Sequence, residues 1–210
     1  MSEPPTDDIR NLSPGQLDAL REVANIGAGH AATALSQMTG STILISVPRI
    51  RVVPMADMSV EVGPPEEPVA AVLMSMLGDI TGRTLLVFPR ATALRLASLL
   101  AGREFVDGQG FGALGESALR EVGNILSGAY LNALSEFLGM VLLNSPPNLA
   151  TGSAKTVLSS GPNSSEAGPY VFCVESEFTM HEQEERLRGF FMLLPDPPSL
   201  RVILKSIRLW

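Results

Sequence analysis

Cysteine and histidine are nearly absent from this sequence. The one cysteine, Cys173, excludes a disulfide framework, and we interpret it as a small buried residue in a strand. The two histidines, His30 and His181, are too few for a metal cluster built on imidazole ligands. We therefore expect the chain to have no metal site of its own. A single thiol also fits the reducing conditions of the cytoplasm.

Positive charge and long apolar runs are also scarce. The formal net charge is -7, and the sequence has neither the basic stripe nor the aromatic series that nucleic-acid binding requires. The longest apolar stretch, 69–77, is about half the length of a membrane span. The first ten residues are acidic and lack the apolar run of a signal peptide. These features favour a soluble, cytoplasmic protein that binds neither nucleic acid nor membrane.

The sequence does contain an internal repeat with a fixed offset of 99 residues. Segments 18–40 and 117–139 are identical at twelve of 23 positions without a gap, and the same offset relates Pro48 to Pro147. A repeat of this kind predicts two similar structural units. The hydrophobic content of 45% is ample for one core that the two units share.

We expect one domain over residues 14–210, preceded by a flexible tail at 1–13. The domain is predicted to consist of two repeats, about 14–102 and 113–208. The first helix should begin at Ser13–Pro14, which offer a cap and a first-turn proline, and should end before Gly40.

The remaining pattern predicts that each half contains a helix, about three strands and a second helix. In the first half we expect strands at 42–53, 69–77 and 84–88 and a helix at 91–101. In the second half we expect a helix at about 115–138, a strand from about 140, strands at 170–180 and 188–194, and a helix at 199–207. Short connections between strands predict antiparallel hairpins, and therefore an α+β fold. Pro48, which cannot donate a ladder hydrogen bond, indicates an edge, a bulge or a strand end.

Each long helix is predicted to carry a polar stripe opposite an apolar face. At 3.6 residues per turn, one stripe holds Asp18, Glu22, Asn25 and Gly29, and its copy holds Ser117, Glu121, Asn124 and Gly128. The apolar faces, expected to be buried, comprise Leu20, Val23, Ala24, Ala31, Ala34, Leu35 and Met38, and in the second copy Leu119, Val122, Leu126, Tyr130, Ala133, Leu134 and Phe137. A polar stripe can simply be the solvated side of a helix. However, asparagine and glycine are poor helix formers, and both copies retain them in mid-helix.

The spacing Asp/Ser-x-x-x-Glu-x-x-Asn, followed by 22 residues and a proline, resembles the signature of the CheC-like chemotaxis phosphatases, the group that includes CheC, CheX and FliY. The signature is complete twice, the first time as Asp18, Glu22, Asn25 and Pro48, and the second as Ser117, Glu121, Asn124 and Pro147. The resemblance implies that the two halves join their strands into one sheet around a pseudo-twofold axis.

The resemblance also implies an activity, namely hydrolysis of the aspartyl phosphate of a CheY-like response regulator. An asparagine amide has an acceptor and two donors and is suited to orienting a water molecule. By analogy with the family, Asn25 and Asn124 would orient the attacking water, and Glu22 and Glu121 would pair with a lysine of the regulator. The Mg²⁺ would be supplied by the regulator, so the chain would need no cofactor of its own. Asp18 and Ser117 could contact the partner, and Pro48 and Pro147 would shape the following strand.

Other interpretations of the same residues stay open at this stage. A binding module that associates with the receptor deamidase CheD, or with the flagellar switch, could use the same fold without catalysis. A carboxylate pair of the glycosidase type, formed by Glu22 and Glu121, is a further alternative. His30 is interpreted as a structural or surface residue. Serine-based catalysis is disfavoured, because no histidine in the motif lies near Ser117 to activate it.

Overall fold

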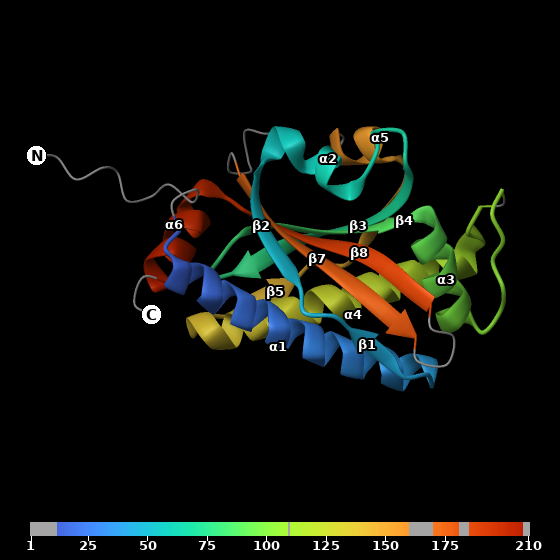
Figure 1. Ribbon diagram of the computed structural model, residues 1–210, viewed down its shortest axis with the longest axis horizontal. Helices are drawn as coiled ribbons and strands as arrows, with labels where there is room; N and C mark the ends of the chain where they lie inside the picture. Colours follow the sequence, from blue (N-terminus) through green and yellow to red (C-terminus); the bar gives the residue numbers. More distant parts are fainter. Residues whose placement is uncertain (1–11, 109, 160–169, 181–184, 208–210) are drawn as a thin grey trace, which may run out of the picture.

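The computed structural model describes residues 12–108, 110–159, 170–180 and 185–207, and its elements follow the same order in both halves (Figure 1). The first half contains α1 (Pro14–Thr39), β1 (Ile43–Ile45), β2 (Arg49–Pro54), a 3-10 turn (Met55–Asp57), α2 (Met58–Val62), β3 (Pro68–Gly78), β4 (Gly82–Pro89) and α3 (Arg90–Ala101). The second half contains α4 (Gly112–Leu138), β5 (Leu142–Asn144), β6 (Asn148–Ser153), α5 (Ala154–Ser159), β7 (Tyr170–Met180), β8 (Glu185–Pro195) and α6 (Pro197–Ile207). The predicted α+β class is confirmed.

Local sequence signals start the first long helix and end both of them. At the start of α1, the Gln16 N–H donates to Ser13 Oγ (3.3 Å) and the Ser13 N–H donates to Gln16 Oε1 (2.8 Å), which forms a capping box. Both helices end at a glycine in the left-handed region, Gly40 (φ 66°) and Gly139 (φ 64°), where a side chain would be strained. The repeat therefore includes the helix stop as well as the helix.

All strands belong to one antiparallel sheet with the order β1-β7-β8-β4-β3-β5, in which β2 also pairs with β7 and β6 also pairs with β3. The hairpins β3–β4 and β7–β8 form the centre. The strands that follow α1 pair with the hairpin of the second half, and those that follow α4 pair with the hairpin of the first half. Each half thus supplies outer strands to the other half.

The register of these pairs obeys the predicted pseudo-twofold symmetry. Ile45 lies opposite Phe178 in one outer pair, and Asn144 lies opposite Met76 in the other, which is the equivalent position of the repeat. The strands β4 and β8 pair with each other at the centre of the sheet, where the two halves meet. The symmetry that the sequence predicted is therefore present in the hydrogen-bonded sheet.

Helices cover both faces of the sheet, but unequally (Figure 1). The long helices α1 and α4 lie on one face with α3 and α6, and they enclose the larger core. The short helices α2 and α5 cover part of the other face, above a smaller core that includes Val171, Cys173 and Phe190. Within the described ranges, no helix combines the length and apolarity needed to span a bilayer.

The structure corrects several expectations about individual elements. The strand predicted at 42–53 is divided into β1 and β2, because the chain leaves the ladder around Pro48. The strand β8 begins at Glu185, so the predicted loop is shorter, and most of that loop lies outside the described residues, as do the tail 1–11 and segment 160–169. Met38 is exposed rather than buried, since the last turn of α1 lies at the edge of the molecule. The helices α2 and α5 are too short to show a helical period in the sequence.

Candidate functional site

The helices α1 and α4 lie side by side and run in opposite directions (Figure 1). Their close approach depends on a small residue, because a Cβ at Gly27 would lie 2.6 Å from Cδ1 of Tyr130. On the sheet side of α4, a Cβ at Gly123 would lie 2.5 Å from Cγ1 of Val72. These two glycines therefore have an explanation in internal packing.

The predicted polar stripes lie on the side of the helices away from the core. Glu22, Glu121 and Asn124 are exposed, and Asn25 is half-buried. Their helix neighbours Val23 and Val122 are buried in the core beneath them. In each copy, the glutamate and the asparagine are three residues apart, so their side chains lie next to each other on the helix surface.

These four side chains are available to a partner. Within the described part of the chain, none of Glu22, Asn25, Glu121 and Asn124 forms a hydrogen bond or ion pair through its side chain. Several carboxylates on other elements are already in use, for example Glu175, which is paired with two arginines. The stripe thus presents acceptors and amide donors that the fold itself does not satisfy.

The two sets form separate sites. Gly27 of α1 lies against Tyr130 of α4, and this contact fixes how the antiparallel helices are aligned. At 1.5 Å per residue, Asn25 and Asn124 are on the order of 12 Å apart along the helix axes, and the two glutamates on the order of 20 Å. A glycosidase pair requires carboxyl groups separated by about 5–9.5 Å, so the structure argues against that alternative for Glu22 and Glu121.

The first position of each stripe differs between the copies. Asp18 accepts a hydrogen bond from Arg21 Nη1 (2.7 Å) in an exposed ion pair. In the second copy, where Ser117 replaces the aspartate, Arg120 instead bonds Oε2 of Glu116 (3.0 Å). Ser117 is exposed. Each copy therefore keeps an arginine paired with a carboxylate, although the carboxylate stands at a different position of the repeat. In the sequence, the only sign of this arrangement is that Arg21 and Arg120 are identical.

The motif prolines lie apart from the polar stripes, at the two equivalent breaks in the sheet. The N–H of Ser46 donates to O of Glu177 (2.9 Å) just before Pro48, which is buried. The N–H of Ser145 donates in the same way to O of Ser75 (2.9 Å) before Pro147, which is half-buried.

Proline cannot donate the next hydrogen bond, so the outer strand is interrupted at each site. This agrees with the prediction that Pro48 and Pro147 shape the strand that follows the helix.

Known proteins match this chain in the regions that carry the stripes and the prolines. The model of the CheC-like family matches residues 16–51 and 114–150, which include both stripes and both motif prolines. A Bacillus subtilis protein named CheY-P phosphatase CheC is 31% identical over 202 residues, which are 95% of this chain and 97% of the relative. The chain belongs to the CheC-like family.

Two further comparisons agree with that membership. The Bacillus subtilis flagellar motor switch phosphatase FliY is 31% identical over 155 residues, and the match covers 71% of this CheC-like chain but 39% of FliY. The crystal structure of Thermotoga maritima FliY superposes with a TM-score of 0.76 at 22% identity, covering 95% of this chain and 98% of that one. The latter likeness concerns the fold.

Two reactive side chains of the CheC-like chain, Cys173 and Tyr130, are buried. Burial raises the pKa of the Cys173 thiol to about 12, which confirms the interpretation of this residue as part of a core. Burial likewise raises the pKa of Tyr130 to about 12, and its hydroxyl lies 2.8 Å from Oγ of Ser176. His30 is exposed. In the described ranges, no three acidic, cysteine or histidine side chains gather as a metal site.

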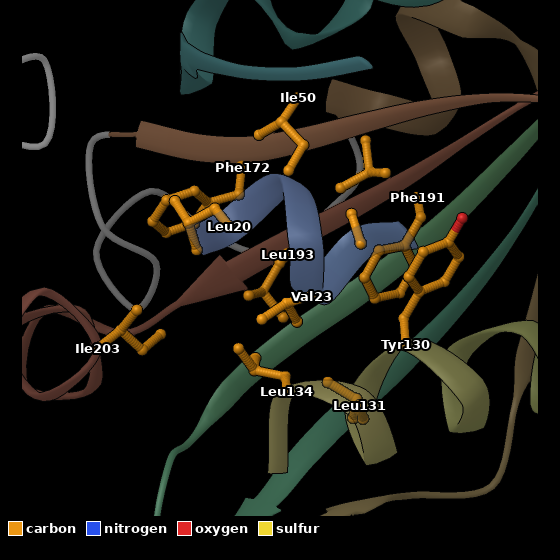
Figure 2. Close-up of a pocket in the computed structure, with 12 residues that line it drawn as sticks. Leu20, Val23, Ile50, Tyr130, Leu131, Leu134, Phe172, Phe191, Leu193 and Ile203 are labelled. Carbon is orange, nitrogen blue, oxygen red and sulfur yellow. The ribbon is translucent and has the colours of Figure 1, made fainter. Parts of the chain in front are cut away.

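An apolar cavity of about 50 Å³ lies directly behind the first stripe (Figure 2). Leu20 and Val23 of α1 line it together with Phe172, Phe191 and Tyr130, whose ring stacks on Phe191 with 4.7 Å between the centroids. Among the described residues, none of those that line this cavity is charged. We interpret it as imperfect packing under α1 rather than as a second reaction site.

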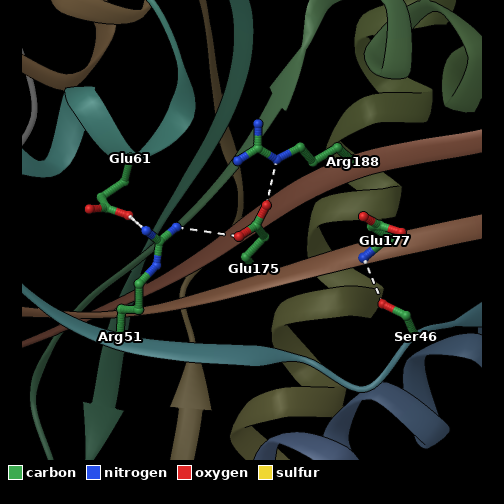
Figure 3. A network of polar contacts seen from close by, with 6 residues as sticks. All are labelled: Ser46, Arg51, Glu61, Glu175, Glu177 and Arg188. Atoms are coloured by element: carbon green, nitrogen blue, oxygen red, sulfur yellow. Dashed lines mark hydrogen bonds and ion pairs between the residues drawn. The ribbon is translucent and has the colours of Figure 1, made fainter.

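A network of ion pairs occupies the other face of the sheet (Figure 3). Arg51 bonds Glu61 of α2 (2.7 Å) and Glu175 of β7 (3.3 Å), and Glu175 also accepts from Arg188 Nε (2.6 Å). The charges in this network neutralise each other and connect α2 to β2, β7 and β8. The network therefore stabilises the cover of the smaller core.

Proposed function

We propose that this CheC-like protein is a phosphatase that hydrolyses the aspartyl phosphate of a CheY-like response regulator. The observation that carries the proposal is the pair of complete glutamate–asparagine sets on the side of the helices away from the core, whose side chains bond no other described residue. The Bacillus subtilis relative, 31% identical over nearly the whole chain, is named as a phosphatase of CheY-P. The response regulators are cytoplasmic proteins, so we infer the same location for this chain.

The asparagines act by placing a water molecule. Asn25 and Asn124 are not bases near neutral pH, but each amide can hold one water through its oxygen and its N–H groups. The oxygen of that water attacks phosphorus, the bond from phosphorus to the aspartate oxygen breaks, and the aspartate leaves as a carboxylate. An acyl phosphate is already reactive, so alignment of the water supplies much of the rate enhancement.

The glutamates hold the partner in register. Glu22 and Glu121 each lie three residues before the asparagine, close enough that a lysine bound to the carboxylate brings the phosphoryl group over the amide. The Mg²⁺ belongs to the regulator, and the stripe contributes no ligand to it in this proposal. Asp18 and Ser117 lie at the edge of the contact.

The proposal is tested by mixing the purified chain with a response regulator phosphorylated with a radioactive label in the presence of Mg²⁺. The phosphatase interpretation requires that the label is released as inorganic phosphate faster than from the regulator alone. Binding of the phosphorylated regulator without acceleration would support the alternative of a non-catalytic binding module. The same preparation can be mixed with CheD, which the family resemblance suggests as a second partner.

A further inference from the structure

The polar stripes contain one feature that no described residue explains. Gly29 follows Asn25 by four residues, and Gly128 follows Asn124 by four, so each glycine lies one turn further along the same stripe. A Cβ at either position would meet no atom of the described residues within 4 Å, and neither glycine has a positive φ. Alanine would fit both positions and is the better helix former.

The glycines that internal packing does explain behave differently in the repeat. Gly27 lies against Tyr130, and the equivalent position in α4 is Leu126. Gly123 lies against Val72, and the equivalent position in α1 is Ala24. The packing glycines are thus confined to one copy each. The glycine one turn after the asparagine, which is exposed at Gly29 and half-buried at Gly128, is present in both copies.

Several other identities of the two helices have a cause that is visible in the structure. Leu20, Val23 and Leu35, like their equivalents in α4, are buried in the larger core. Gly40 and Gly139 end the helices at a left-handed residue. The identical positions that internal packing does not explain are largely exposed and lie around each asparagine. Among them, the glycine is the one that lacks a side chain.

We propose that Gly29 and Gly128 are the points at which the backbone of the phosphorylated response regulator touches the helix. The inference rests on the proposed function and names a contact of the same two sites. A missing Cβ lets the partner come closer by roughly 1.5 Å, the length of one carbon–carbon bond. A flexible side chain of the partner could move aside for a methyl group, so the gap matters only where the partner is rigid, as backbone is.

This contact would set the distance between the amide and the phosphoryl group. The glycine lies one turn, or about 5.4 Å, from the asparagine along the helix. A methyl group there would lift the regulator away from the helix at the place where the water must be aligned. A displacement of about 1 Å can lower the rate of a positioned reaction about 100-fold.

The test is the double variant Gly29→Ala/Gly128→Ala in the full chain. We expect its melting temperature to rise by about 4–8 °C, because alanine is the better helix former at both positions and no described residue obstructs it. We expect hydrolysis of the phosphorylated regulator to fall at least tenfold, and leucine at both positions to lower it further because the obstruction is larger. Loss of structure could not explain a variant that is more stable than the parent but hydrolyses the regulator more slowly.

The matched control is Gly15→Ala, also in α1. A Cβ at Gly15 would approach only Oγ of Ser13, at 4.0 Å, and the equivalent position of α4 already carries Leu114. This variant should keep the parent rate. The variants Gly29→Ala in an Asn124→Ala background and Gly128→Ala in an Asn25→Ala background report on each site alone.

The outcomes separate this inference from the proposed function. If the parent hydrolyses the regulator and the double glycine variant does so at the same rate, the contact is wrong and the function stands. A lower melting temperature of that variant would also overturn the contact, since the glycines would then serve the fold. If the parent binds the regulator without hydrolysing it, weaker binding by the variant supports the contact although the function is wrong. A parent that neither binds nor hydrolyses overturns both.

Discussion

The double variant Asn25→Ala/Asn124→Ala tests the proposed mechanism most directly. Both asparagines lie on the solvent side of their helices, and their side chains bond no other described residue, so their removal leaves no buried group unsatisfied. Alanine is favoured over asparagine in a helix by about 0.5 kcal/mol, so the double variant should be about 1 kcal/mol more stable than the parent.

The expected loss of activity follows from what an amide contributes. Without it, the water remains available but is no longer held in line, a change that costs about 100-fold in rate. Because the two sites are separate, each single variant should keep the activity of the other site, and the double variant should lose both. The affinity for the phosphorylated regulator should change little, since alignment of water stabilises the transition state rather than the complex.

The assay measures release of labelled phosphate at several regulator concentrations, together with binding and thermal unfolding of each variant. A fall in kcat with unchanged affinity and an unchanged or higher melting temperature is the expected pattern. Hydrolysis by the double variant at the parent rate would refute the role of the asparagines. The non-catalytic binding module would become the better interpretation if, in addition, the parent did not accelerate hydrolysis.

Three further predictions concern the partner contact, the fold and the thiol. Glu22→Gln together with Glu121→Gln should weaken binding of the regulator and make that binding less dependent on salt, because a charge pair with lysine is lost. Titrations at two ionic strengths would check this. Unchanged affinity at both would count against the contact. The halves 1–105 and 106–210, expressed separately, should fail to unfold cooperatively, since each half lacks the outer strands that the other supplies. A sharp calorimetric transition for either half would show that it folds on its own. Cys173 should not react with a thiol reagent at pH 8 in the folded protein, because burial raises its pKa to about 12. The thiol should react once denaturant is added. Rapid labelling without denaturant would contradict its burial.

Local patterns in the sequence were sufficient for the long helices and for their polar stripes. A helical period of 3.6 places Glu22 and Asn25 on one stripe whatever lies behind the helix, so their exposure could be predicted from spacing alone. The stop at Gly40 and the cap at Ser13 are likewise properties of a few neighbouring residues. The repeat gave a second copy of the stripe and of the helix stop, at Glu121, Asn124 and Gly139, whereas the side-chain cap is found on α1 and not on α4.

Tertiary structure decided what depends on residues far apart in the chain. The exchange of strands between the halves pairs β2 with β7 and β6 with β3 across long stretches of sequence, and no local pattern specifies such a partner. Gly27 and Gly29 are two residues apart, and the sequence alone does not show which of them is required by packing. Only the position of Tyr130 shows that the first is required by packing and the second is not, because whether a Cβ fits depends on atoms that a different helix brings to that place.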